Sequence, residues 1–360
     1  MLDKSAKIYV AGHRGLVGSA IWNNLKQRGY TNLVGKTHME LYLLDGAAVK
    51  AFFDEEKPDA VILAAAHVGG IMANSIYRAD FIYNNLQIQQ NVIGESFRHG
   101  VKKLLFLGST CIYPRDAEQP MKEDVLLTSP LEYTNEPYAI AKIAGLKMCE
   151  SFNLQYGTNY IAVMPTNLYG PNDNFHLERS HVLPAMIRKI HLAKCLNEGK
   201  WDAVRKDLNK RPVEGIDGTS NEKEILNILA KYGIHENHVM LWGTGRPMRE
   251  FLWSEEMADA SVHVLLNVDF KDTYAEGCKD IRNCHINVGT GKEISIYDVA
   301  MLIQKEIDFK GEIRWDATKP DGTMRKLTDV SKLHGLGWHH KVEIDEGVHK
   351  MYEWYLEDQK

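Results

Sequence analysis

The stretch that decides the fold reads Lys7-Ile8-Tyr9-Val10-Ala11-Gly12-His13-Arg14-Gly15-Leu16-Val17-Gly18. Its first five residues have the apolar run of a buried strand, and a helical pattern over 19–28 follows the glycines. A strand, a glycine turn and a helix in this order predict a dinucleotide-binding unit, because glycines let the backbone approach a pyrophosphate at the helix N-terminus. The spacing is G-x-x-G-x-x-G, and a glycine turn in an unrelated βαβ unit is the alternative.

The alternation of strands and helices continues beyond this unit. The expected strands are 32–35, 59–63, 103–108 and 160–164, and the expected helices are 47–56, 75–99 and 137–156. This order predicts an α/β fold with a doubly wound parallel (Rossmann) sheet over residues 1–175. A smaller, mainly substrate-binding α/β domain is expected over 176–360, with a segment of about 240–290 returning to the first domain.

A polar segment of mixed charge occupies residues 196–238. We expect it to be an insertion with little core of its own. The sequence leaves open whether it lies near a ligand pocket or extends a subunit interface.

The composition describes an ordinary globular protein of 360 residues, with 44% hydrophobic and 25% charged residues. The formal net charge of -5 gives no support for a nucleic-acid-binding surface. Five cysteines without a C-x-x-C pair favour a reducing, cytoplasmic compartment and no metal site. The polar N-terminus predicts no signal peptide, and no apolar stretch is long enough to predict a membrane span.

The end of the second strand bears on the choice of cofactor. NAD sites usually place a carboxylate there, and this chain has Lys36-Thr37-His38 with no carboxylate before Glu40. Together with Arg14, these cations favour the 2′-phosphate of NADPH. The alternative is that Lys36 and His38 are solvated loop residues.

A tyrosine and a lysine lie one helical turn apart at Tyr138 and Lys142. We expect the ammonium group to lower the pKa of the phenol, which would make it a proton donor near neutral pH. Ser109 follows the strand 103–108, at the edge where such sheets bind ligands, and is placed to orient a carbonyl. The Y-x-x-x-K spacing by itself occurs by chance in many helices.

With these residues in chain order, the sequence resembles the extended short-chain dehydrogenases/reductases. Longer runs are similar to the GDP-L-fucose synthase family within that group. The runs are 11–20 (AGHRGLVGSA), 64–71 (AAAHVGGI), 108–114 (GSTCIYP), 135–142 (NEPYAIAK), 164–171 (MPTNLYGP) and 319–323 (KPDGT). The resemblance covers nearly the whole chain outside 196–238.

The resemblance implies that GDP-4-keto-6-deoxy-D-mannose is epimerised at C3 and C5 and then reduced at C4 by NADPH. Cys111 and His181 match the family's acid/base pair for the epimerisation, and which of them is the acid stays open. Read from the residues alone, Cys111 is a small packed residue and His181 a helix N-terminal residue. For the reduction, Tyr138 would donate a proton to the C4 oxygen, Lys142 would hold the nicotinamide ribose, and Ser109 would bind the ketone.

The family's binding positions also carry over. The cofactor contacts implied are Gly12, His13, Arg14, Gly15, Leu16, Val17, Gly18, Lys36, His38, Leu107, Gly108, Lys142, Pro165, Thr166, Asn167, Leu168 and His181. The substrate contacts implied are Lys189, Trp242, Arg249 and Asp321, for which a core tryptophan and a solvated lysine are the alternatives. His38 stands where the family commonly has arginine, which leaves Arg14 as the main cation.

Two other functions compete with this interpretation. One is an NAD-dependent nucleotide-sugar 4-epimerase or dehydratase of the same fold, against which Cys111 and the missing carboxylate at 36–38 argue. The other is a catalytically silent NADP-sensing protein, against which the intact Ser109, Tyr138 and Lys142 argue. The family also implies a homodimer, in which the helices 75–99 and 137–156 pair with their copies.

Overall fold

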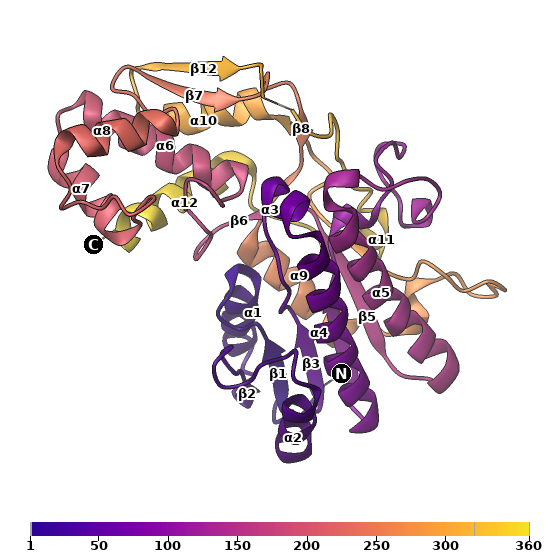
Figure 1. Ribbon diagram of the computed structural model, residues 1–360. Coiled ribbons are helices and arrows are strands. Elements are labelled where there is room, and N and C mark those ends of the chain that lie inside the picture. The colour runs from indigo at the N-terminus through magenta and orange to yellow at the C-terminus, as the bar shows by residue number, and fades with distance from the viewer. Residues whose placement is uncertain (1, 320, 360) are drawn as a thin grey trace. The chain divides into compact units, whose positions relative to one another are not determined.

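The computed structural model describes residues 2–319 and 321–359 and divides into two compact units (Figure 1). Each unit is assembled from three stretches of chain. Unit 1 comprises Met1–Leu168, Glu250–Lys292 and Leu327–Lys341, and unit 2 comprises Tyr169–Arg249, Glu293–Lys326 and Val342–Lys360. Among the described residues, no helix is both long and apolar enough to cross a membrane.

Unit 1 is built on a six-stranded parallel sheet with the strand order β10-β5-β4-β3-β1-β2. Its strands are β1 (Ile8–Ala11), β2 (Leu33–Val34), β3 (Ala60–Leu63), β4 (Lys103–Leu107), β5 (Tyr160–Pro165) and β10 (Ile286–Val288). The sheet confirms the doubly wound α/β fold expected from the sequence. The edge strand β10 comes from the second stretch of unit 1, after the chain has passed through unit 2.

Both faces of this sheet are buried. Ile8 and Val10 of β1 belong to one apolar cluster, while Tyr9 and Ala11 belong to the other. The first cluster also holds side chains of α1 (Leu16–Gln27) and α9 (Ser254–Asn267). The second holds side chains of α2 (Gly46–Glu56), α4 (Arg78–Arg98) and α5 (Glu136–Tyr156). Because helices cover both faces, the strands read as continuous apolar runs without alternation.

The expected helix over 75–99 is two helices in the structure, α3 (Ile71–Ile76) and α4, separated at Tyr77. Tyr77 has φ −97° and ψ 42°, outside helical geometry, and neither proline nor glycine marks this break in the sequence. The remaining regular elements of unit 1 are η1 (Thr110–Ile112), η2 (Glu123–Val125), η3 (Tyr133–Asn135), β9 (Phe251–Trp253), η4 (Phe270–Thr273) and α11 (Ser331–Gly335). β9 pairs with β6 (Asn167–Tyr169), where the chain leaves unit 1.

Unit 2 combines helices with short strand pairs. Its helices are α6 (Val182–Asn197), α7 (Trp201–Lys210), α8 (Glu222–Lys231), α10 (Ile296–Ile307) and α12 (Ile344–Asp358). The parallel pair joins β7 (His238–Trp242) to β12 (Glu312–Asp316), and the antiparallel pair joins β8 (Met248–Arg249) to β11 (Ile294–Ser295).

The polar segment 196–238 contains the two helices α7 and α8, and each packs apolar side chains inward. Val204 and Leu208 of α7 and Ile225 and Leu229 of α8 are all fully buried. Each helix is polar on average but carries its apolar residues at helical spacing, so one stripe packs inward. The overall polarity of the segment conceals this periodicity.

Candidate active site

The glycine loop connects β1 to α1 in unit 1. Gly12 has φ +86°, and a Cβ there would lie 2.8 Å from the backbone nitrogen of Ala65. A Cβ on Gly18 would lie 2.1 Å from the carbonyl oxygen of Gly12. Both positions therefore require glycine. Gly15 precedes α1 without a side-chain cap, so the first-turn N–H groups can bind an anion such as a pyrophosphate.

The expected cations around the loop differ in their surroundings. Arg14 and His38 are exposed. The pKa of Glu40 is lowered mainly by hydrogen bonds to Thr37, and the charges of Lys36 and Arg14 lower it further. His13 instead packs against Trp22, with 5.4 Å between ring centroids, and against Gly35. The helix N-terminus and the exposed Arg14 fit a dinucleotide with an additional phosphate.

Three of the expected catalytic side chains gather after β4. Ser109 Oγ accepts a hydrogen bond from the backbone N–H of Cys111 at 3.2 Å, and Ser109 lies close enough to Tyr138 to oppose the rise in the pKa of the phenol. Cys111 is half-buried and close enough to Tyr138 for its charge to affect the pKa of the phenol. Gly108 lets the Met164 side chain pack close to the backbone, because a Cβ there would meet the Met164 sulfur at 2.2 Å.

Lys142 lies one helical turn beyond Tyr138 on α5. Its Nζ donates to the carbonyl oxygen of Leu107 at 2.8 Å and lies 5.8 Å from the centroid of the Tyr138 ring. Burial lowers the pKa of Lys142 to about 7. Burial also raises the pKa of Tyr138, aided by Cys111 and opposed by the hydrogen bond with Ser109. This differs from the lowered phenol pKa expected from the sequence, because burial outweighs a lysine directed at a backbone carbonyl.

The expected cofactor stretch 165–168 lies where β5 passes into β6. The side chain of Asn167 donates to the carbonyl oxygen of Glu250 at 2.9 Å, and Thr166 N donates to the carbonyl oxygen of Val288 at 3.0 Å. Pro165 ends β5, and Leu168 packs against the sheet's apolar core, as Leu107 does. These contacts hold the stretch at the carboxyl edge of the sheet.

In unit 2, α6 carries two of the expected residues. His181 immediately precedes the helix, and its carbonyl oxygen accepts from Ala185 N at 3.1 Å. Lys189 is buried, and this burial lowers its pKa to about 8. The alternative of a solvated lysine on an exposed helix face is therefore wrong.

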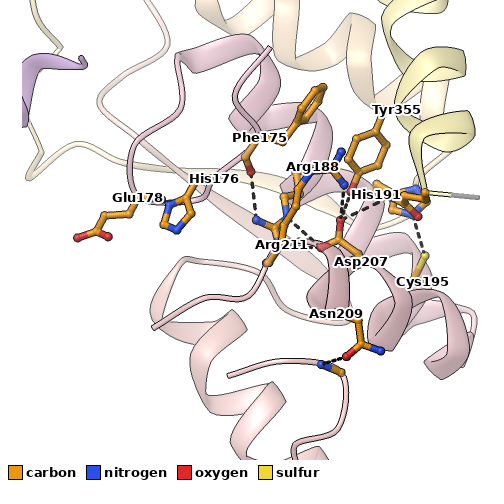
Figure 2. A network of polar contacts seen from close by, with 12 residues as sticks. Phe175, His176, Glu178, Arg188, His191, Cys195, Asp207, Asn209, Arg211 and Tyr355 are labelled. Carbon is orange, nitrogen blue, oxygen red and sulfur yellow. Dashed lines mark hydrogen bonds and ion pairs between the residues drawn. The ribbon is translucent and has the colours of Figure 1, made fainter. Parts of the chain in front are cut away.

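The residue next to Lys189 anchors α6 inside unit 2 (Figure 2). Arg188 is fully buried, and its Nε donates to Asp207 of α7 at 2.8 Å. The hydroxyl of Tyr355 on α12 donates to the other oxygen of Asp207 at 2.6 Å. A second nitrogen of Arg188 donates to the carbonyl oxygen of Phe175 at 3.1 Å, in the loop that leads to His181. The network thus fixes both α6 and the loop before it.

The three other expected substrate residues also lie in unit 2. Trp242 is 61% exposed at the end of β7, so the alternative of a core tryptophan is wrong. Asp321 accepts from Thr244 N at 2.6 Å and Thr244 Oγ1 at 2.8 Å, and its charge acts on Arg249. Pro320, in the expected run 319–323, lies outside the described residues.

Sequence reasoning missed Thr244, which holds the Asp321 carboxylate. The signal that points to it is the Gly243-Thr244-Gly245 turn directly after a strand. Both glycines have positive φ, +79° and +75°, and a Cβ on Gly243 would lie 2.3 Å from an oxygen of Asp321.

The arrangement can transfer protons to and from a carbonyl compound. Unit 1 offers a protonated phenol, a hydroxyl, a thiol and a lysine that titrates near neutral pH, all at the edge of the sheet that also bears the glycine loop. Unit 2 offers a histidine, a buried lysine, an exposed tryptophan, an arginine and an aspartate, which suit an anionic nucleotide carrying a sugar.

The chain was compared with known proteins. Residues 8–211 match the model of the NAD dependent epimerase/dehydratase family. GDP-L-fucose synthase 1 of Arabidopsis thaliana is 51% identical over 99% of this chain and 95% of its own. GDP-L-fucose synthase of Escherichia coli is 47% identical over 98% of this chain and 97% of its own.

Among solved structures, the GDP-mannoheptose C4 reductase MlghC of Campylobacter jejuni, with NADP bound, is 44% identical with a TM-score of 0.87. That comparison covers 99% of this chain and 100% of the other. The chain therefore belongs to the NAD dependent epimerase/dehydratase family, in the group that contains the GDP-L-fucose synthases.

Proposed function

We propose that the protein converts GDP-4-keto-6-deoxy-D-mannose to GDP-L-fucose by epimerisation at C3 and C5 and NADPH-dependent reduction at C4. The observation that carries the proposal is the grouping of Ser109, Cys111 and Tyr138 at the carboxyl end of β4. Full-length identity of 47% and 51% to two relatives named GDP-L-fucose synthase supports it.

Epimerisation needs one group to remove a proton beside the ketone and another to return a proton to the opposite face. C3 and C5 both flank C4, so the ketone acidifies their protons. Cys111 and His181 serve as this pair, since a thiol and an imidazole both exchange protons near neutral pH. Ser109 holds the ketone oxygen during the exchange.

Reduction needs a proton for the C4 oxygen, and a bound NADPH supplies the hydride. The raised pKa of Tyr138 keeps the phenol protonated until negative charge develops on that oxygen. The N-terminus of α1 and Arg14 would hold the cofactor phosphates, and the Asn167 stretch would contact the cofactor. Lys189, Trp242, Arg249 and Asp321 bind the GDP-sugar.

The decisive experiment follows NADPH and NADH oxidation in parallel with GDP-4-keto-6-deoxy-D-mannose, with chromatography of the product. We expect NADPH to be consumed and GDP-L-fucose to form. No cofactor oxidation, together with NAD that co-purifies with the protein, would instead indicate the 4-epimerase or dehydratase.

A second candidate is a GDP-heptose C4 reductase, because MlghC shares 44% of its sequence with this chain over full length. The same assay with a 4-keto GDP-heptose separates the two functions. A higher kcat/KM for the heptose than for the deoxyhexose would favour the second candidate.

We further propose a homodimer that works in the cytoplasm. The helices α4 and α5 pack side by side and expose Tyr83 and Ile140, which supports a contact between copies. The odd number of cysteines and the lack of a C-x-x-C pair support a reducing compartment.

A further inference from the structure

Glu250 is a fully buried carboxylate to which the proposed chemistry assigns no role. One of its oxygens accepts from the backbone N–H groups of Thr290 and Gly291, each at 2.7 Å. The other accepts from the N–H of Thr328 at 3.0 Å and from its hydroxyl at 2.7 Å. The Thr290 hydroxyl donates to the first oxygen as well, at 3.5 Å. Five donors on one buried carboxylate make a rigid, fully satisfied junction.

The backbone of Glu250 joins the same junction. Its carbonyl oxygen accepts from Asn167 Nδ2 at 2.9 Å and from Thr166 Oγ1 at 3.3 Å. Gly289 completes the packing, because a Cβ there would lie 2.2 Å from the Glu250 carboxylate and 2.5 Å from Thr328 Oγ1. The geometry therefore requires a small residue beside the carboxylate.

The partners of Glu250 stand where the chain passes between the two units. The stretches of unit 1 end at Leu168 and Lys292, and they begin again at Glu250 and Leu327. Asn167, Gly291 and Thr328 each adjoin one of these residues, and Glu250 is one itself. Glu250 thus binds, within unit 1, residues at or next to four points where the chain leaves or re-enters this unit.

We propose that Glu250 is a positioning residue whose carboxylate fixes the backbone direction of the peptide that carries the substrate arginine, Arg249. Arg249 is its covalent neighbour in unit 2, and Asn167 is bound to its carbonyl oxygen. If the carboxylate loses its donors, the peptide that carries Arg249 loses its fixed direction. The inference rests on the proposed function, because it assigns Arg249 to the GDP-sugar.

The test compares Glu250→Gln with Glu150→Gln in the full-length protein. Glu250→Gln keeps the shape of the side chain but replaces one carboxylate oxygen by an NH2 group. This group cannot accept from the donors that bind that oxygen. Glu150 is a matched control: it is a buried carboxylate of unit 1, accepts from Lys147 and Cys284 N, and lies away from the crossings. Both variants should lose thermal stability.

Only Glu250→Gln should also raise the KM for the GDP-sugar and the Kd for GDP, by about tenfold or more. Its Kd for NADPH, from fluorescence titration, should change by less than about threefold, because Asn167 still meets a backbone carbonyl. Thr328→Val and Thr328→Ser provide a milder pair if Glu250→Gln does not fold. The valine should shift the KM in the same direction, and the serine, which keeps the hydroxyl, should restore it.

Equal KM values in Glu250→Gln, Glu150→Gln and the unmodified protein would overturn the inference and leave the proposed function intact. Indistinguishable KM values in Thr328→Val and Thr328→Ser would overturn it in the same way. An unmodified protein that neither binds GDP nor consumes NADPH with the substrate would overturn both.

Discussion

At the scale of single residues, the site depends on how burial tunes groups that are ordinary in water. Tyr138 and Lys142 lie one turn apart, yet burial moves their pKa values in opposite directions, up for the phenol and down to about 7 for the ammonium. Both shifts favour the neutral form. Tyr138 is therefore suited to give a proton rather than to hold a negative charge.

The two proposed chemical steps can be separated by substitution. Cys111→Ser should abolish solvent deuterium exchange at C3 and C5, because the hydroxyl is a far weaker acid than the thiol. Tyr138→Phe should permit this exchange while reduction falls by about 10² to 10⁴. Mass spectrometry of the recovered GDP-sugar reports the exchange. If the Cys111 variant exchanges at the rate of the unmodified protein, Cys111 has no part in the mechanism.

The free energy of unfolding should depend on pH through the titration of Lys142. The unfolded lysine keeps its proton up to about pH 10.5, while the folded one loses it above about pH 7. The unfolded state therefore binds more protons in this window, and the lysine destabilises the fold increasingly as pH falls from 10.5 to 7.

Lys142→Met should gain stability relative to the unmodified protein on going from pH 10 to pH 7, by at most roughly 4 kcal/mol. Urea denaturation at both pH values measures the difference. Lys26→Met, on the exposed face of α1, is the control and should show no such trend. A pH-independent difference for Lys142→Met would contradict the assigned direction.

At the scale of elements, backbone geometry and buried polar contacts place the functional groups. The turn between β1 and α1 works only with glycine at two positions, and α6 is held through its Arg188 by Asp207 of the neighbouring helix α7. Both features are local in space. The glycine turn is also local in sequence. The Arg188–Asp207 contact instead joins two helices and forms only when their apolar faces pack together.

Gly12→Ala tests the turn against a matched glycine. Gly12 and Gly29 have almost the same φ, +86° and +84°, but only Gly12 has backbone within 4 Å of an added Cβ. Both alanines should cost about 1 kcal/mol for the backbone conformation. Only Gly12→Ala should also weaken NADPH binding, by about tenfold or more in a fluorescence titration. Equal affinities in the two variants would contradict a phosphate-binding turn.

Asp207→Asn tests the anchor of α6. It leaves the Arg188 charge buried without its carboxylate, which should cost about 3 to 5 kcal/mol in urea denaturation. Replacing both partners with Arg188→Met and Asp207→Leu should cost less than the single change. Glu198→Gln, which breaks an exposed pair with Lys200, should cost far less than Asp207→Asn, because solvent screens an exposed pair. An Asp207→Asn variant as stable as this control would show that the pair contributes nothing.

At the scale of the whole molecule, the chain builds two units by passing repeatedly between them. The stretches Glu250–Lys292 and Leu327–Lys341 return to unit 1 and supply the edge strand β10 and the partners of Glu250. Neither unit is a continuous piece of sequence. A single cut in the chain therefore cannot separate the two units.

The proposed dimer gives a prediction at this scale. Tyr83 is 66% exposed on α4, and Tyr83→Glu should place a charge in the contact between copies and yield a monomer. Leu226→Glu, at an apolar position on α8 that is 43% exposed, should leave the dimer unchanged. Sedimentation velocity at micromolar concentration distinguishes these outcomes, and an unmodified protein that sediments as a monomer would contradict the dimer.

The sequence by itself determined the parallel α/β sheet and the order of its first strands and helices, because these depend on short apolar runs and glycine turns. It also indicated Ser109, Tyr138 and Lys142 through their order and spacing, and Cys111 through the family resemblance. It could not show the break at Tyr77, which no proline or glycine marks.

Only the tertiary structure decided the pKa shifts of these groups and the long-range hydrogen bonds around the site. The raised pKa of Tyr138 arises from burial that no spacing encodes. Glu250 meets Thr290 and Thr328 across 40 and 78 residues of chain. Such contacts depend on where distant segments pack, and that is decided when the whole core forms.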